Sequence, residues 1–170
     1  MLSLSLSLCL LPLLASAHPA VSSSNVTCPP DATSPPPILS WHIHTLFWPD
    51  GAKDNDGPHS IQAALEFRDD FIDAFDLREA KECDSLQDND NKLCVFPPDI
   101  DPGFGFAAPF ITPSWAVFLP KARFAEVYPW FVQHHEQLDI LLHPNTGCAV
   151  ADHTDYASWL GQEWELKLSF

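Results

Sequence analysis

Apolar and polar positions divide the first half of the folded region into a strand and a helix. Residues 38–48, ILSWHIHTLFW, are rich in β-branched and aromatic side chains, which predicts a strand. In residues 59–77, apolar side chains recur at helical spacing, as at Ile61, Leu65 and Ile72. The sequence therefore predicts a strand followed by an amphipathic helix.

The second half contains further segments of both kinds. Strands are predicted for KLCVFPP, SWAVFLP and LDILLHP, and an amphipathic helix for KARFAEVYPWFVQHHEQ. Pro129 lies inside that helix and predicts a kink or a break. A short helix capped by Asp152 is predicted to end at Gly161.

The order of these elements is β-α-β-β-α-β with a short C-terminal helix. This order predicts an α+β, ferredoxin-like fold, in which a four-stranded antiparallel sheet carries two helices on one face. The other face is left for a ligand site, a partner chain or the extra helix.

The residues before this domain have a different composition. Residues 1–17 contain no charged side chain and end in Ala-Ser-Ala, which predicts a cleaved signal peptide and a secreted product. Residues 18–37 are rich in Ser and Pro and predict an extended arm, so the folded domain is expected at 38–170. No later segment is predicted to span a membrane.

The charge of the chain limits its partners. The 170 residues carry 8 Lys and Arg against 23 Asp and Glu, a formal charge of −15. Phosphate backbones and anionic membrane surfaces repel such a chain, so neither nucleic acid nor a membrane is expected as a partner.

The cysteines agree with an oxidising compartment. Four remain after signal cleavage, and four cysteines allow three pairings. Cys83 and Cys94 flank a polar loop whose base they could clip, which leaves Cys28 to pair with Cys148. The alternative is four free buried thiols. Asn25 stands in an Asn-Val-Thr sequence that is an acceptor for N-glycosylation.

Two histidines in the first predicted strand are candidates for metal binding. Side chains alternate along a strand, so His42 and His44 point to one face while Trp41 and Ile43 take the other. Two imidazoles on a rigid face suit a divalent metal. The alternative is a pair of histidines that only form hydrogen bonds.

Two later clusters could complete such a site. His143 closes a strand in HPNTG, where Asn145 and Thr146 supply hydrogen-bonding groups in a turn. Asp152 and His153 place a carboxylate beside an imidazole, which could orient a base. The alternative is a purely structural role, in which these residues only cap a strand and a helix or form a turn.

These motifs resemble those of the DOPA 4,5-dioxygenase family of fungi and bacteria. WHIHTLFW, FPPD, APF, PSWAVFLP, LDILLHPNTG and DHTDYASWLG occur in the family's order over about residues 40–162. The resemblance implies a ferredoxin-like fold, often dimeric, so a homodimer is a further expectation. It also implies a non-haem iron(II) site at which O₂ cleaves the ring of a catechol such as DOPA.

The resemblance also implies roles for individual residues. Metal ligands are expected at His42, His44 and His143, and His153, oriented by Asp152, is expected to move protons. A substrate pocket is expected from the following side chains, although plain core packing explains the phenylalanines equally well: Trp41, Phe104, Phe106, Phe110, Asn145 and Thr146.

Two positions depart from the family pattern. Ala108 stands where the family has a histidine, and His134-His135 replaces an Asn-Arg pair. Secretion also makes a different divalent metal, or none, an alternative to iron(II). Two functions follow: a metal-dependent extradiol dioxygenase, or a non-catalytic secreted relative that binds an aromatic molecule or a protein.

Overall fold

A computed structural model describes residues 26–29, 31, 33–49, 57–84, 91–101 and 105–168. The predicted signal peptide, Asn25 and Phe104 lie outside these residues. Among the helices of the described part, none is long and apolar enough to cross a membrane.

One antiparallel sheet organises the described chain. Its five strands follow the order β2-β3-β1-β4-β5. The three central strands are β1 (Ser40–Leu46), β3 (Ser114–Pro120) and β4 (Asp139–Asn145), and the edges are β2 (Cys94–Val95) and β5 (Ser158–Leu160). The order of the first four strands is that of the predicted ferredoxin-like fold, which is therefore confirmed.

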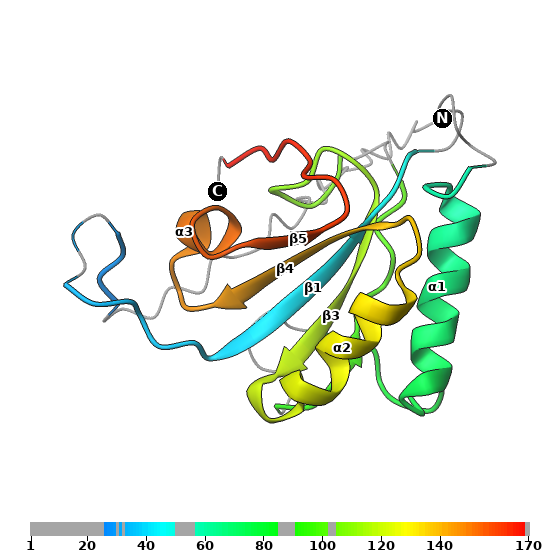
Figure 1. Cartoon of the computed structure of the whole chain (residues 1–170), viewed down its shortest axis with the longest axis horizontal. Helices are drawn as coiled ribbons and strands as arrows, with labels where there is room; N and C mark the ends of the chain where they lie inside the picture. The colour runs from blue at the N-terminus through cyan, green and yellow to red at the C-terminus, as the bar shows by residue number, and fades with distance from the viewer. Residues whose placement is uncertain are drawn as a thin grey trace, which may run out of the picture.

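Two helices cover one face of this sheet. They are α1 (Ile61–Ala74) and α2 (Phe124–His134), the second preceded by a 3₁₀ turn at Lys121–Arg123 (Figure 1). Helix α1 begins after Ser60, whose hydroxyl accepts a hydrogen bond from the backbone N–H of Ala63. Helix α2 continues through Pro129, so the predicted break does not occur.

The main hydrophobic core lies between the sheet and these helices. Ile43 of β1 is directly opposite Val117 of β3 and Leu142 of β4, and all three belong to this core. Trp115 packs beneath α1 and donates its indole N–H to the carbonyl of Ala64 at 2.9 Å. Because side chains alternate, His42 and His44 lie on the opposite face of β1, as predicted.

The C-terminal region differs from the predicted single helix. A short helix, α3, runs from Ala149 to His153 after Cys148, so Asp152 lies inside the helix and does not cap its start. The chain then turns and forms β5, which pairs with β4 and extends the predicted four-stranded sheet by one strand. The unpaired edge of β4 favours this addition, because its backbone groups gain partners.

Both predicted disulfides are present. Cys83 pairs with Cys94 near the β2 edge, and Cys28 pairs with Cys148 just before α3. The second bond attaches the N-terminal arm to the turn that follows β4.

Candidate metal centre

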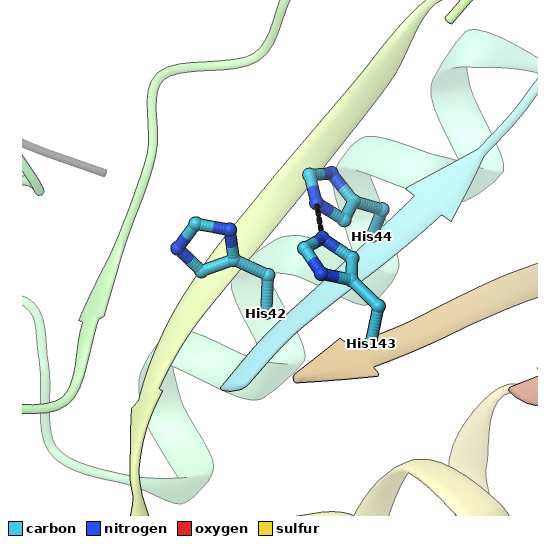
Figure 2. Close-up of side chains that lie close together, drawn as sticks. All are labelled: His42, His44 and His143. Carbon is cyan, nitrogen blue, oxygen red and sulfur yellow. Dashed lines mark hydrogen bonds between the residues drawn. The ribbon is translucent and has the colours of Figure 1, made fainter. Parts of the chain in front are cut away.

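Three histidines meet on the face of the sheet opposite α1 and α2. His42 and His44 come from β1, and His143 of β4 lies directly opposite His42 in the antiparallel register. Figure 2 shows the three rings gathered above the two strands. All are buried, with exposed fractions of 4%, 4% and 2%. The alternation of two paired strands is enough to bring these imidazoles together.

The distances between the rings suit a shared metal ion. The Nε2 atoms of His44 and His143 are 3.1 Å apart. Each of the three residues offers one ligand atom, and these atoms lie within 4.8 Å of one another. Metal–nitrogen bonds of about 2.1 Å place two ligands of one ion roughly 3 to 4.2 Å apart. His44 and His143 already meet this condition, and a nitrogen of His42 lies within 4.8 Å of both.

The hydrogen bond made by His143 prepares its other nitrogen for a metal. Nδ1 lies 2.9 Å from the carbonyl oxygen of Pro144, which can only accept, so Nδ1 carries the proton and donates. The neutral ring then has its lone pair on Nε2, the atom that faces His44. Metal-bound histidines commonly donate their second nitrogen to a backbone carbonyl in this way. The donor set therefore fits a divalent metal.

His153 lies beside the three histidines. Its ring centroid is 3.9 Å from that of His143, and the planes are inclined by 36°. Nδ1 of His153 donates to the carbonyl of Ala149 at 2.8 Å. The neutral ring therefore keeps Nε2 as its proton acceptor, which is the arrangement an acid/base needs.

Asp152 supports the turn after β4. Its carboxylate accepts hydrogen bonds from the backbone N–H and the hydroxyl of Thr146, at 3.0 and 2.6 Å. Burial raises the pKa of Asp152, and the hydrogen bonds from Thr146 oppose that shift. Asp152 was expected to orient His153, but the hydrogen bond to the Ala149 carbonyl orients this ring. Asp152 instead fixes the turn that follows His143.

Comparison with known proteins identifies the family of the chain. The model of the Dopa 4,5-dioxygenase family matches residues 41–170. The chain belongs to this family. A DOPA 4,5-dioxygenase from Amanita muscaria is 27% identical over 134 residues, which are 78% of this chain. The aligned region is 49% of that relative, so the chain spans about half of its length.

A solved structure is also similar. It is a candidate dioxygenase from Nostoc punctiforme PCC 73102, with 25% sequence identity and a TM-score of 0.49. The similarity covers 76% of this chain and 88% of that one.

In this family member, one of the expected pocket residues contacts the histidines. Phe110 is buried, and its ring centroid lies 4.5 Å from that of His44 and 6.4 Å from that of His153. Phe106, a few residues earlier, is partly buried. Phe110 thus supplies an aromatic surface beside two of the imidazoles.

The other expected pocket residues have different surroundings. Trp41 faces the helices and packs against Phe124, with ring centroids 4.8 Å apart. Asn145 donates its side-chain amide to the hydroxyl of Ser40, and Thr146 bonds to Asp152. Trp41 lies on the opposite side of the sheet from the histidines because successive side chains of a strand point to opposite faces.

The structure also reveals two aromatic neighbours of His42 that the sequence did not single out. The rings of Phe96 and Phe118 lie 5.5 and 5.9 Å from that of His42. Phe118 is opposite His42 in the β1–β3 register. Phe118 shares the histidine face because it pairs with His42 in the register, which the sequence of SWAVFLP alone does not show.

The departure at Ala108 falls in the turn that carries Phe110. The backbone N–H of Phe110 donates to the carbonyl of Ala107, and the carbonyl of Pro109 accepts from the N–H of Lys167. Both bonds fix the turn that ends at the aromatic ring beside His44. Ala108 therefore lies two residues before the ring that contacts His44.

Proposed function

We propose that this chain is a secreted, metal-dependent extradiol dioxygenase that opens the ring of a catechol such as DOPA. The observation that carries the proposal is the convergence of His42, His44 and His143 on one sheet face. Membership of the Dopa 4,5-dioxygenase family supports the reaction class. The two disulfides and the character of residues 1–17 support secretion.

The three histidines would hold the metal through one nitrogen each. Iron(II), when bound, supplies the redox chemistry that allows a catechol to react with O₂. Two strands of the same sheet carry the ligands, so their spacing is fixed by the backbone pairing of β1 and β4. Three protein ligands leave further coordination positions for small molecules.

His153 is the residue proposed to handle protons. Nδ1 donates to the Ala149 carbonyl, so Nε2 can take a proton from a catechol hydroxyl and return it later. Its ring lies against that of His143, which keeps it next to the ligand set. Phe110 would pack against the aromatic substrate and exclude water from the His44 side.

A second candidate function is binding of an aromatic molecule without turnover. The observation that favours it is Ala108, which replaces the histidine expected at this position in the family. If that histidine is the essential acid/base elsewhere in the family, this chain would bind but would not react.

Oxygen uptake separates the two functions. The purified protein is loaded anaerobically with Fe(II), mixed with L-DOPA or catechol, and exposed to O₂. The enzyme proposal expects uptake and a yellow ring-opened product, both lost in His143→Ala because a ligand is removed. The exposed histidine in His134→Ala is the matched control and should leave both unchanged.

The contrary results are equally specific. Bound metal and bound catechol without oxygen uptake would support the non-catalytic alternative. A protein that retains no metal after loading would contradict the enzyme proposal.

A further inference from the structure

Two phenylalanines pack against His42 on the side away from His143. The ring of Phe96 stands nearly perpendicular to that of His42, with planes at 81°, and the ring of Phe118 is inclined by 64°. Such edge-to-face contacts between aromatic rings are favourable and directional. They restrict the angles at which the imidazole can lie.

The orientation of His42 decides whether it can join the other two histidines. The rings of His44 and His143 are almost parallel, at 12°, and their Nε2 atoms face each other. The ring of His42 is turned by 81° from the first and 85° from the second. His42 therefore approaches the shared position from a different direction, and the residues that pack on its ring control that approach.

The backbone around Phe96 is firmly held. Its N–H donates to the carbonyl of Ala116 in β3 at 2.8 Å. Its carbonyl accepts from Nη2 of Arg68 at 3.4 Å, and the same guanidinium pairs with Glu82. Two prolines follow Phe96 and restrict the backbone further. The ring is thus presented from a fixed position on the sheet edge.

A disulfide lies directly behind these rings. Cys94 of β2 is opposite Phe118 in the β2–β3 register, and its partner Cys83 donates its backbone N–H to the carbonyl of Val95. Cys83, Cys94 and Phe118 form one buried cluster, and Phe96 packs against it. The covalent link joins the segment at Cys83 to the strand that leads into Phe96.

We propose that Phe96 and Phe118, braced by the Cys83–Cys94 disulfide, form an aromatic clamp that positions His42 as a metal ligand. The inference rests on the metal site of the proposed function. Both phenylalanines are positioning residues, because they act through His42. Phe96 is the better residue to test, since it is half-buried at the sheet edge whereas Phe118 is 2% exposed in the core.

Cobalt(II) provides a probe that does not depend on turnover. The protein is titrated with Co(II), and both the affinity and the visible absorption bands, which report ligand number and geometry, are recorded. Phe96→Leu keeps an apolar side chain but removes the ring, and we expect about ten-fold weaker binding with altered bands, as for other residues that orient metal ligands. Phe96→Tyr retains the ring and should preserve wild-type affinity and bands.

A matched control separates positioning from general stability. Phe124→Leu makes the same change at a half-buried aromatic residue on the helix side of the sheet, where Phe124 packs on Trp41. This variant should lower the melting temperature without changing the cobalt bands. Cys83→Ala/Cys94→Ala, which removes the brace, should weaken cobalt binding in the same direction as Phe96→Leu.

The outcomes distinguish this inference from the proposed function. Wild-type binding with the same affinity and bands in Phe96→Leu would overturn the clamp and leave the metal site standing. Equal losses in Phe96→Leu and Phe124→Leu would overturn it as well, because the effect would then be one of stability. A wild-type protein that binds no cobalt would overturn both.

Discussion

The hydroxyl of Thr45 is buried without a hydrogen bond to any described residue. Thr45 is 0% exposed on the helix side of β1, and its Oγ1 has no hydrogen-bond partner among the described residues. Leaving a buried polar group unsatisfied costs about 1–3 kcal/mol. We therefore expect Thr45→Val, which replaces the hydroxyl by a methyl group of similar size, to increase the free energy of unfolding by about 1 kcal/mol. Urea denaturation measures this change.

Thr146 is the control for that substitution. Its hydroxyl is also buried but donates to Asp152 at 2.6 Å. Thr146→Val should lower the free energy of unfolding by about 2 kcal/mol, because it removes a charge-assisted hydrogen bond. Changes of the same sign in the two variants would contradict this account of the two hydroxyls.

Asp152 should make stability depend on pH in an unusual direction. Burial raises its pKa in the folded protein above the usual value of an aspartate, so the folded state binds a proton more tightly than the unfolded state does. Its contribution to stability is therefore greatest below the unfolded pKa and is lost as pH rises through the raised folded pKa. Asp152→Asn cannot titrate and should lack this part of the pH dependence.

The comparison uses the unfolding free energy of both proteins across acidic pH. The unfolding free energy of wild type minus that of Asp152→Asn should fall as pH rises from about 4, the usual pKa of an aspartate. If this difference grows with pH instead, the hydrogen bonds from Thr146 lower the pKa of Asp152 by more than burial raises it.

Residue-level patterns predicted the histidine pair but not the role of Asp152. Alternation along one strand was sufficient to place His42 and His44 on the same face. The direction of the Asp152 carboxylate depends on where α3 begins, which is Ala149 rather than the residue after Asp152. A capping pattern in the sequence fits several starting positions, and the contact with Thr146 selects one of them.

At the scale of elements, the sequence predicted the βαββαβ order and missed β5. That strand has three residues, Ser158–Leu160, and its sequence suits the end of a helix equally well. Pairing with β4 decides the outcome, and such pairing is a long-range contact that local patterns do not contain. The continuous path of α2 through Pro129 likewise depends on packing, since Val127 and Phe131 are both buried in the core.

Gly161 is required where the chain leaves β5. Its φ is +87°, and a Cβ atom there would collide with Oδ1 of Asp139. The same carboxylate accepts hydrogen bonds from the backbone of Gln162 and the indole of Trp164. Gly161→Ala should therefore cost the strain of a left-handed alanine, about 1–2 kcal/mol, and a further 1–3 kcal/mol for the displaced carboxylate.

A substitution at Gly105 measures the backbone strain without the displacement of a carboxylate. Its φ is +76°, but an added Cβ would meet no described atom within 4 Å. Gly105→Ala should lose only the backbone contribution, about 1–2 kcal/mol in urea denaturation. If Gly161→Ala and Gly105→Ala lower the free energy of unfolding equally, the Asp139 carboxylate moves aside without a measurable cost.

At the scale of the whole molecule, the two disulfides close loops of very different size. Cys28 and Cys148 are 120 residues apart, and Cys83 and Cys94 are 11 apart. If a disulfide acts by restricting the unfolded chain, the longer loop contributes about 2 kcal/mol more. Cys28→Ala/Cys148→Ala should thus lower the free energy of unfolding by that much more than Cys83→Ala/Cys94→Ala. The reverse order in urea denaturation would contradict the argument.

The assembled site depends on contacts that only the whole fold provides. Sequence motifs identified His42, His44, His143 and His153, and the strand order then placed them together. Phe96 escaped notice because it follows a two-residue strand and contacts His42 across β3. Trp41 was expected in the pocket, yet it directly precedes His42 in β1 and therefore faces the helix side of the sheet.

The central claim is that His42, His44 and His143 bind one divalent metal ion. A crystal structure of the protein loaded anaerobically with Fe(II), with anomalous diffraction at the iron edge, tests it most directly. The account predicts a single anomalous peak about 2.1 Å from one nitrogen of each of the three histidines. An anomalous peak bound by other residues, or no peak at the three imidazoles, would contradict it.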